Sequence, residues 1–249
     1  MAKSTGKVVL WHLLMAGAAL GTLAAWRWQR RWGATAAEQR AVLPGDDLIP
    51  QPLAQATRAI GIDAPPDVVW PWLKQLGYGK AGFYSYAWLQ RLAGLDIENA
   101  DAIVPEWADI EVGSTVNLAE DLGLSVACAE PERALVLVGA GDPPPGMGQF
   151  DFSWAFVLEP EGPVGTRLVV RERYSWSRWL DGLTIKAVGW VSFVMSRAML
   201  QGIRARAERS WQDRLDARLD DAAADVPESP SAVGSAGAGD QADAPQALA

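Results

Sequence analysis

The chain has 249 residues, 49% hydrophobic and 21% charged, which allows one domain of ordinary size with appended segments. The net charge of −8 argues against nucleic acid as a partner, because binding phosphates needs clustered Lys and Arg. The single Cys excludes an internal disulfide, and the single His, His12, lies before the domain, which excludes a histidine-based triad or metal site there. We therefore expect neither a metal nor a cofactor.

The first candidate element is an uncharged apolar segment, residues 8–26. Its length suits one bilayer core, which needs about 20 apolar residues. More basic residues follow the segment than precede it, and Arg27, Arg30 and Arg31 come directly after it. The pattern predicts an uncleaved single-pass membrane anchor with the rest of the chain on the cytoplasmic side, because positive flanks stay in the cytoplasm.

Composition then divides the chain into four parts. Residues 1–42 form the anchor and its basic flank, and residues 43–55, rich in Pro, Asp and Gln, are predicted to be a linker. Residues 56–224 carry all the periodic patterns and are predicted to be the folded domain. Residues 225–249 are small, polar and proline-containing, which predicts a disordered tail. On this division, a fragment without residues 1–42 and 227–249 should fold by itself.

Alternation and turn residues predict a strand, two short helices and a run of antiparallel strands before the C-terminal helix. Asp67 is expected to cap the first helix, and Pro71 to lie in its first turn. The spacing between the later strands is too short for crossover helices, so we expect an antiparallel sheet. The predicted elements are the strand Ala56–Asp63, the helices Val68–Leu76 and Tyr86–Ala93, and the strands Asp109–Leu118, Leu124–Glu130, Ala134–Gly139, Phe150–Leu158 and Thr166–Ser175.

The last predicted element is a long helix, Leu183–Ala224, whose two halves differ. The first half is apolar nearly all round, whereas the second narrows to a stripe of apolar residues every four positions. An apolar half must be enclosed, either by a curved sheet or by a membrane as a second span. Its uninterrupted apolar run, Ala187–Met195, is well short of the length of a span, which favours the sheet. The order predicts an α+β helix-grip fold: a curved antiparallel sheet wrapped around the C-terminal helix, with an N-terminal transmembrane helix.

The segments IDAPPDVVWPWL and RAMLQGIRARAE, with the stretch between them, resemble the membrane-anchored bacterial branch of the SRPBCC superfamily. That superfamily also includes START-like lipid carriers and polyketide cyclase/dehydratases. The resemblance covers about residues 56–208. It implies the helix-grip fold and an apolar ligand held in a cavity between the sheet and the last helix. It implies no particular reaction.

Within such a fold, several side chains are candidates for lining the cavity. One face of a predicted strand carries aromatic residues, and another strand carries two arginines that could orient a carboxylate, an enolate or a phosphate. The same aromatic and Met residues could instead be ordinary core, the arginines a solvated outer face, and the tyrosines amphipathic rim residues. The candidates are Tyr84, Tyr86, Phe152, Trp154, Phe156, Arg171, Arg173, Trp190, Val194, Met195 and Met199.

Three functions follow from this interpretation. The first is a membrane-anchored protein that binds a hydrophobic small molecule, such as a lipid, an isoprenoid or a polyketide-like compound. The second is a cyclase or dehydratase on the same fold, and the third is a membrane-tethered interaction module without a ligand. We favour binding over catalysis, because binding needs only apolar walls with one or two orienting groups, whereas catalysis needs convergent polar groups.

Overall fold

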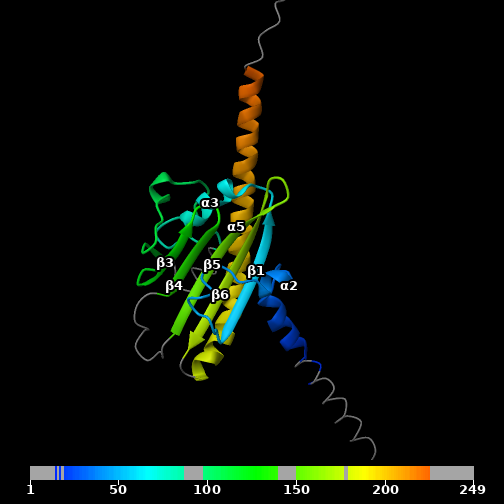
Figure 1. Ribbon diagram of the computed structural model, residues 1–249, viewed down its shortest axis with the longest axis vertical. Coiled ribbons are helices and arrows are strands. Elements are labelled where there is room, and N and C mark those ends of the chain that lie inside the picture. Colours follow the sequence, from blue (N-terminus) through cyan, green and yellow to red (C-terminus); the bar gives the residue numbers. More distant parts are fainter. Residues whose placement is uncertain are drawn as a thin grey trace, which may run out of the picture. The chain divides into compact units, whose positions relative to one another are not determined.

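The computed structural model describes residues 15, 17, 20–86, 98–139, 150–176 and 179–224 (Figure 1). The chain divides into two compact units, residues 1–213 and 214–249. The sheet lies in the first unit, and the described part of the second is the end of the C-terminal helix. The predicted tail lies outside the described residues, and so do all residues but one of the predicted second short helix.

The observed elements confirm an α+β protein. A helical segment, residues 20–29, comes first and is followed by the elements shown in Figure 1. These are α2 (Ala36–Arg40), β1 (Ala54–Ile62), α3 (Pro66–Lys74), a 3-10 helix (Pro105–Trp107), β2 (Thr115–Ala119), β3 (Leu122–Glu130), β4 (Ala134–Gly139), β5 (Phe150–Glu161), β6 (Gly165–Trp176) and α5 (Trp179–Ala224).

The six strands form one antiparallel sheet in the order β1-β6-β5-β4-β3-β2. Strands β2 to β6 form a meander, and β1 pairs with β6, so the first and last strands of the domain are neighbours. Register shifts interrupt the β2–β3 and β3–β4 pairs, and such bulges bend and twist a sheet. The predicted strand Asp109–Leu118 is shorter than expected, because β2 begins only after the turn at Gly113, whose φ is +91°.

Helix α3 begins earlier than predicted, at Pro66. Its N-cap is Pro65, which makes no side-chain hydrogen bond, so the expected capping by Asp67 is wrong. Because of the earlier start, Pro71 lies inside the helix rather than in its first turn. The helix buries Trp72 and Leu73 against the sheet.

Both faces of the sheet are covered. The inner face packs against α3 and α5, and forms the main core with residues such as Phe156, Leu168, Leu200 and Ile203. The outer face carries a smaller cluster, which consists of Leu43, Ala59, Val157 and Val169. The fold is therefore the helix-grip arrangement: an antiparallel sheet with a long C-terminal helix against its inner face.

The outer cluster exists because residues 29–49 belong to the fold. The backbone N–H groups of Thr57 and Ala59 donate to the carbonyls of Arg30 and Trp32, so this segment covers the free edge of β1. At the following turn, a Cβ on Gly33 would lie 2.0 Å from the Ala59 carbonyl oxygen, a separation that only glycine allows. The basic flank is thus packed on the sheet rather than separated from it.

The predicted linker, residues 43–55, is also part of the folded unit. Leu43 and Ile49 are each 6% exposed, and β1 begins at Ala54, inside the expected linker. Its Pro, Asp and Gln residues are typical of a linker, but they form a buried turn on the outer face. The first strand therefore begins two residues before the expected boundary at residue 56.

In the part of the chain that the structure describes, no helix combines the length and apolarity needed to cross a membrane. The predicted anchor, residues 8–26, lies mostly outside that part, so it stays a prediction.

Candidate functional site

Strand β6 places its polar side chains on two different faces. Glu172 and Tyr174 alternate with Arg171 and Arg173, as the sequence predicts. The register pairs Glu172 with Trp154 and Tyr174 with Phe152 on β5. Both pairs lie on the inner face, so the acid and the phenol, rather than the two arginines, stand beside α5.

Glu172 is the centre of a buried polar cluster, which we call the inner cluster: Arg58, Glu172, Tyr174, Ser192 and Ser196. Its Oε1 accepts from Arg58 Nη1 at 2.7 Å and from Ser196 Oγ at 2.8 Å. Its Oε2 accepts from Tyr174 OH at 2.6 Å and from Ser192 Oγ at 2.9 Å. The inner cluster therefore ties β1 and β6 to α5, and both carboxylate oxygens are fully used.

Electrostatics keep the acid of this cluster ionised. Burial alone would raise the pKa of Glu172, but Arg58 and the three hydroxyl donors hold it below its usual value. Burial and the adjacent Glu172 carboxylate raise the pKa of Tyr174 well above its usual value. At neutral pH the carboxylate is charged and the phenol is protonated, so neither group is poised to exchange a proton.

An aromatic wall lies on β5 beside the inner cluster. Phe152 stacks on Tyr174 with ring centroids 5.0 Å apart. The ring centroid of Trp154 lies 4.8 Å from that of Phe156 and 6.3 Å from that of Phe83. Phe156 is fully buried, whereas Phe152 and Trp154 are partly accessible. These residues were predicted to share one face, and the structure brings them together.

Trp154 carries the one unsatisfied polar group among the described residues of this wall. Its Nε1 is buried and has no hydrogen-bond partner among them. An unmade hydrogen bond on a buried donor costs about 1–3 kcal/mol. The indole N–H is therefore ready to donate to an acceptor that the described residues do not supply.

The four candidates on α5 lie in different surroundings. Met199 is 2% exposed and packs in the main core, and the carbonyl of Met195 accepts from Ser85 Oγ at 3.3 Å. Trp190 and Val194 are 40% and 38% exposed, so they do not form part of the buried wall. The face of α5 that meets the sheet carries Ser192 and Ser196 instead, because those hydroxyls satisfy Glu172.

The two tyrosines differ. Tyr84 is 4% exposed, and its hydroxyl donates to the Trp72 carbonyl at 3.1 Å and accepts from Gln75 Nε2 at 2.8 Å. Burial raises its pKa above the usual range. Its phenol thus holds the loop to α3 and is not available to a ligand. Tyr86 is 41% exposed, as expected of a rim residue.

Arg171 and Arg173 lie on the outer face and do not reach the aromatic wall. Arg171 is 2% exposed, and its Nη1 lies 2.5 Å from Asp46 Oδ2, whereas Arg173 Nε lies 3.0 Å from Asp46 Oδ1. Arg171 also donates to the carbonyls of Glu38 and Ala41. The arginine face is thus buried rather than solvated, and it fastens residues 38–46 over the outer face.

The inner cluster was not predicted from the sequence, although two signals for it were present. Arg58 shares a strand face with Ile60 and Ile62, where a charge needs a buried partner. Ser192 and Ser196 lie four residues apart in the apolar half of α5 and therefore on one helix face. In the described part of the chain, no group of acidic, Cys or His residues could hold a metal ion.

No family model matches the chain, and neither does any curated protein. Among solved structures, the Zhui aromatase/cyclase from Streptomyces sp. R1128 is 16% identical, with 63% of this chain and 94% of that chain covered and a TM-score of 0.38. CalU16 from Micromonospora echinospora is 19% identical, with coverage of 64% and 86% and a TM-score of 0.30. Protein MLL2253 from Mesorhizobium loti is 19% identical, with coverage of 60% and 96% and a TM-score of 0.36.

These similarities are too distant to carry function to this chain, whose fold follows from its own strand order and helix contacts. An antiparallel sheet in the order β1-β6-β5-β4-β3-β2, with the long α5 against its inner face, is a helix-grip fold.

Proposed function

We propose that this protein binds an apolar small molecule beside the aromatic wall, on the inner face of the sheet. The ligand class is a lipid, an isoprenoid or a polyketide-like compound that carries at least one oxygen acceptor. Phe152 and Trp154 supply partly accessible aromatic surface, which suits an apolar body.

The observation that carries the proposal is the indole N–H of Trp154, which has no hydrogen-bond partner among the described residues. A carbonyl or hydroxyl oxygen of the ligand would satisfy it and fix the orientation of the molecule. A hydrogen bond of this kind contributes about 0.5–1.5 kcal/mol. The remaining affinity would come from apolar area removed from water, at about 25 cal/mol per Å².

The inner cluster supports binding over catalysis. A cyclase or dehydratase needs a group that can give or take a proton near the operating pH. Glu172 already accepts four hydrogen bonds and has a lowered pKa, and Tyr174 has a raised one. Both groups are thus suited to holding the sheet to α5, and no other observation favours a reaction.

A dye with a ketone carbonyl tests the site. A naphthyl ketone dye emits at longer wavelength when its carbonyl accepts a hydrogen bond, and excitation of tryptophan selects dye bound to protein. We expect Trp154→Phe in the full chain to weaken dye binding about 2- to 10-fold and to shift the sensitised emission to shorter wavelength.

Trp107→Phe is the matched control, since Trp107 is also half-buried but lies in the 3-10 helix before β2. The control should leave affinity and emission close to those of the wild type. Equal behaviour of the two variants, or no sensitised emission from the wild type, would overturn the proposal.

We also propose that residues 8–26 anchor the protein in the cell membrane as a single pass, with the folded unit in the cytoplasm. The uncharged segment and the arginines after it support this topology. A cysteine introduced as Ser235→Cys, in a Cys128→Ser background, should resist an impermeant reagent in intact cells. Labelling before permeabilisation would reverse the topology.

A further inference from the structure

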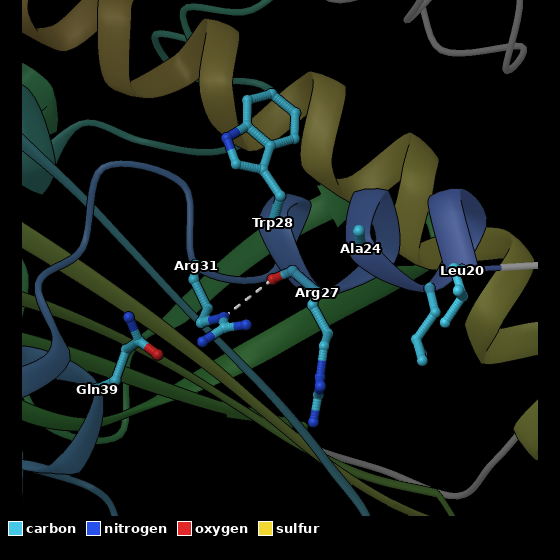
Figure 2. A pocket seen from close by; sticks show the side chains of 7 residues that line it. Leu20, Ala24, Arg27, Trp28, Arg31 and Gln39 are labelled. Atoms are coloured by element: carbon cyan, nitrogen blue, oxygen red, sulfur yellow. Dashed lines mark hydrogen bonds between the residues drawn. The ribbon is translucent and has the colours of Figure 1, made fainter. Parts of the chain in front are cut away.

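A groove of about 670 Å³ lies along the helical segment, residues 20–29 (Figure 2). None of the residues that line it belongs to the aromatic wall. We call it the helix groove. Most of its lining recurs at helical spacing along one face of this segment and its continuation. The lining residues are Leu20, Leu23, Ala24, Arg27, Trp28, Arg31 and Gln39.

The helix groove changes character along its length. Its start is apolar and accessible, since Leu20 is 68% exposed and Leu23 is 48% exposed. Its end is cationic, because it is lined by Arg27 and Arg31, which Figure 2 shows on the same side of the segment. Leu20 and Arg27 are about 10 Å apart along the axis at 1.5 Å per residue. An apolar stretch that ends in positive charge matches an acyl chain that ends in a phosphate.

The two arginines of the helix groove have no acidic partner in the described part of the chain. Arg31 Nε donates to the Arg27 carbonyl at 3.2 Å, which leaves its charge unneutralised. Glu38 lies next to the groove residue Gln39, but its carboxylate pairs with Arg167 at 2.7 Å. A phosphate would supply the charge that both guanidinium groups lack.

The segment that carries the groove is fixed to the domain. Gln29 is 1% exposed, and its carbonyl accepts from Arg58 Nε at 3.1 Å. Trp28 packs edge-on against Phe193 of α5 with ring centroids 5.3 Å apart. The helix groove is therefore a preformed surface, and a ligand there would not have to order it.

We propose that the helix groove binds an anionic phospholipid of the membrane that holds the anchor. Arg27 and Arg31 take the phosphate, and Leu20 and Leu23 take the first part of an acyl chain. The inference rests on the proposed anchor, since the groove begins at Leu20, within the end of segment 8–26, and runs on to the arginines after it, which would lie at the level of the headgroups. Arginines near an anionic bilayer surface contribute roughly 1 kcal/mol each to lipid binding, equivalent to about fivefold in affinity.

Lipid retention tests the proposal. The full chain is equilibrated in mixed micelles of phosphatidylglycerol and phosphatidylcholine, and native mass spectrometry counts the lipids that stay bound. We expect the wild type to retain phosphatidylglycerol in preference, and Arg27→Gln with Arg31→Gln to lower that preference by roughly 25-fold. The matched control, Arg204→Gln with Arg209→Gln, makes the same change in net charge on α5 and should keep the preference.

Two further experiments distinguish a lipid from a soluble phosphate, and an error in the lipid site from an error in the anchor. Leu20→Ser with Leu23→Ser should weaken retention while both charges stay, whereas displacement by soluble glycerol phosphate at equal concentration would overturn a lipid site. Equal retention by the groove variant and the control, or no preference in the wild type, would also overturn it. Extraction of the protein from membranes by alkaline carbonate would refute the anchor alone, because the micelle assay reads lipid selectivity separately.

Discussion

Arg58 Nη1 lies 2.7 Å from Glu172 Oε1, with both side chains almost fully buried between β1, β6 and α5. A buried ion pair is costly to break from one side, because the remaining charge has no partner and no water. The hydroxyl groups of Tyr174, Ser192 and Ser196 also donate hydrogen bonds to the Glu172 carboxylate. The pair therefore acts as a fastening of the helix to the sheet.

Glu172→Gln should lower the free energy of unfolding by about 3–5 kcal/mol, since it leaves Arg58 charged and buried. Urea unfolding followed by circular dichroism measures it, with the exposed Glu111→Gln as control. The double variant Arg58→Met with Glu172→Gln should lose less than the sum of the two single changes. Strictly additive losses would mean that the two residues do not act as a pair.

Acid should destabilise the protein through the same carboxylate. Because the folded-state pKa of Glu172 is lowered, its stabilisation is present above the unfolded pKa of about 4.3 and is lost as pH falls through the folded value. The free energy of unfolding of the wild type should thus be nearly constant near neutral pH and decrease in acid. Glu172→Gln should show a smaller fall between pH ~5 and ~3, and an unchanged profile in this variant would contradict the assignment.

How far the sequence predicts this fold depends on whether the signal is local. Ala134–Gly139 was predicted with the bounds that β4 has, and the two faces of β6 were sorted correctly, because alternation is local. Which β6 face meets α5 was not predictable in this way. Both faces are buried, one under α5 and the other under residues 36–49, so burial does not distinguish them.

The role of Asp46 shows the same limit. It lies among residues whose composition is typical of a linker, and its partner Arg171 lies 125 positions later. No local pattern connects two such residues. For the same reason, the candidate site was half predictable: the aromatic wall on β5 came from one strand, whereas the inner cluster draws on β1, β6 and α5 together.

The expected boundary before residue 43 can now be tested against the structure. A fragment that starts at residue 43 lacks the carbonyls of Glu38 and Ala41, which accept from the buried Arg171. It should be aggregated, or melt at a markedly lower temperature, compared with a fragment that starts at residue 20 and ends at the same place. Equal melting temperatures would restore the boundary at residue 43.

Two glycines of α5 should respond oppositely to the same change. Alanine normally favours a helix interior over glycine by about 1 kcal/mol. At Gly189 the nearest atom to an added Cβ is Gln29 Nε2 at 3.8 Å, an ordinary contact, so Gly189→Ala should stabilise the protein slightly.

At Gly202 an added Cβ would lie 2.2 Å from the Tyr84 carbonyl oxygen and 2.7 Å from its Cβ. Tyr84 cannot easily move away, since its φ is +51° and its hydroxyl makes two hydrogen bonds. Gly202→Ala should therefore cost about 1–3 kcal/mol through overpacking, despite its better helix propensity. Thermal unfolding of the two variants side by side measures the difference. A Gly202→Ala protein as stable as Gly189→Ala would show that the loop at Tyr84 does not rest on α5.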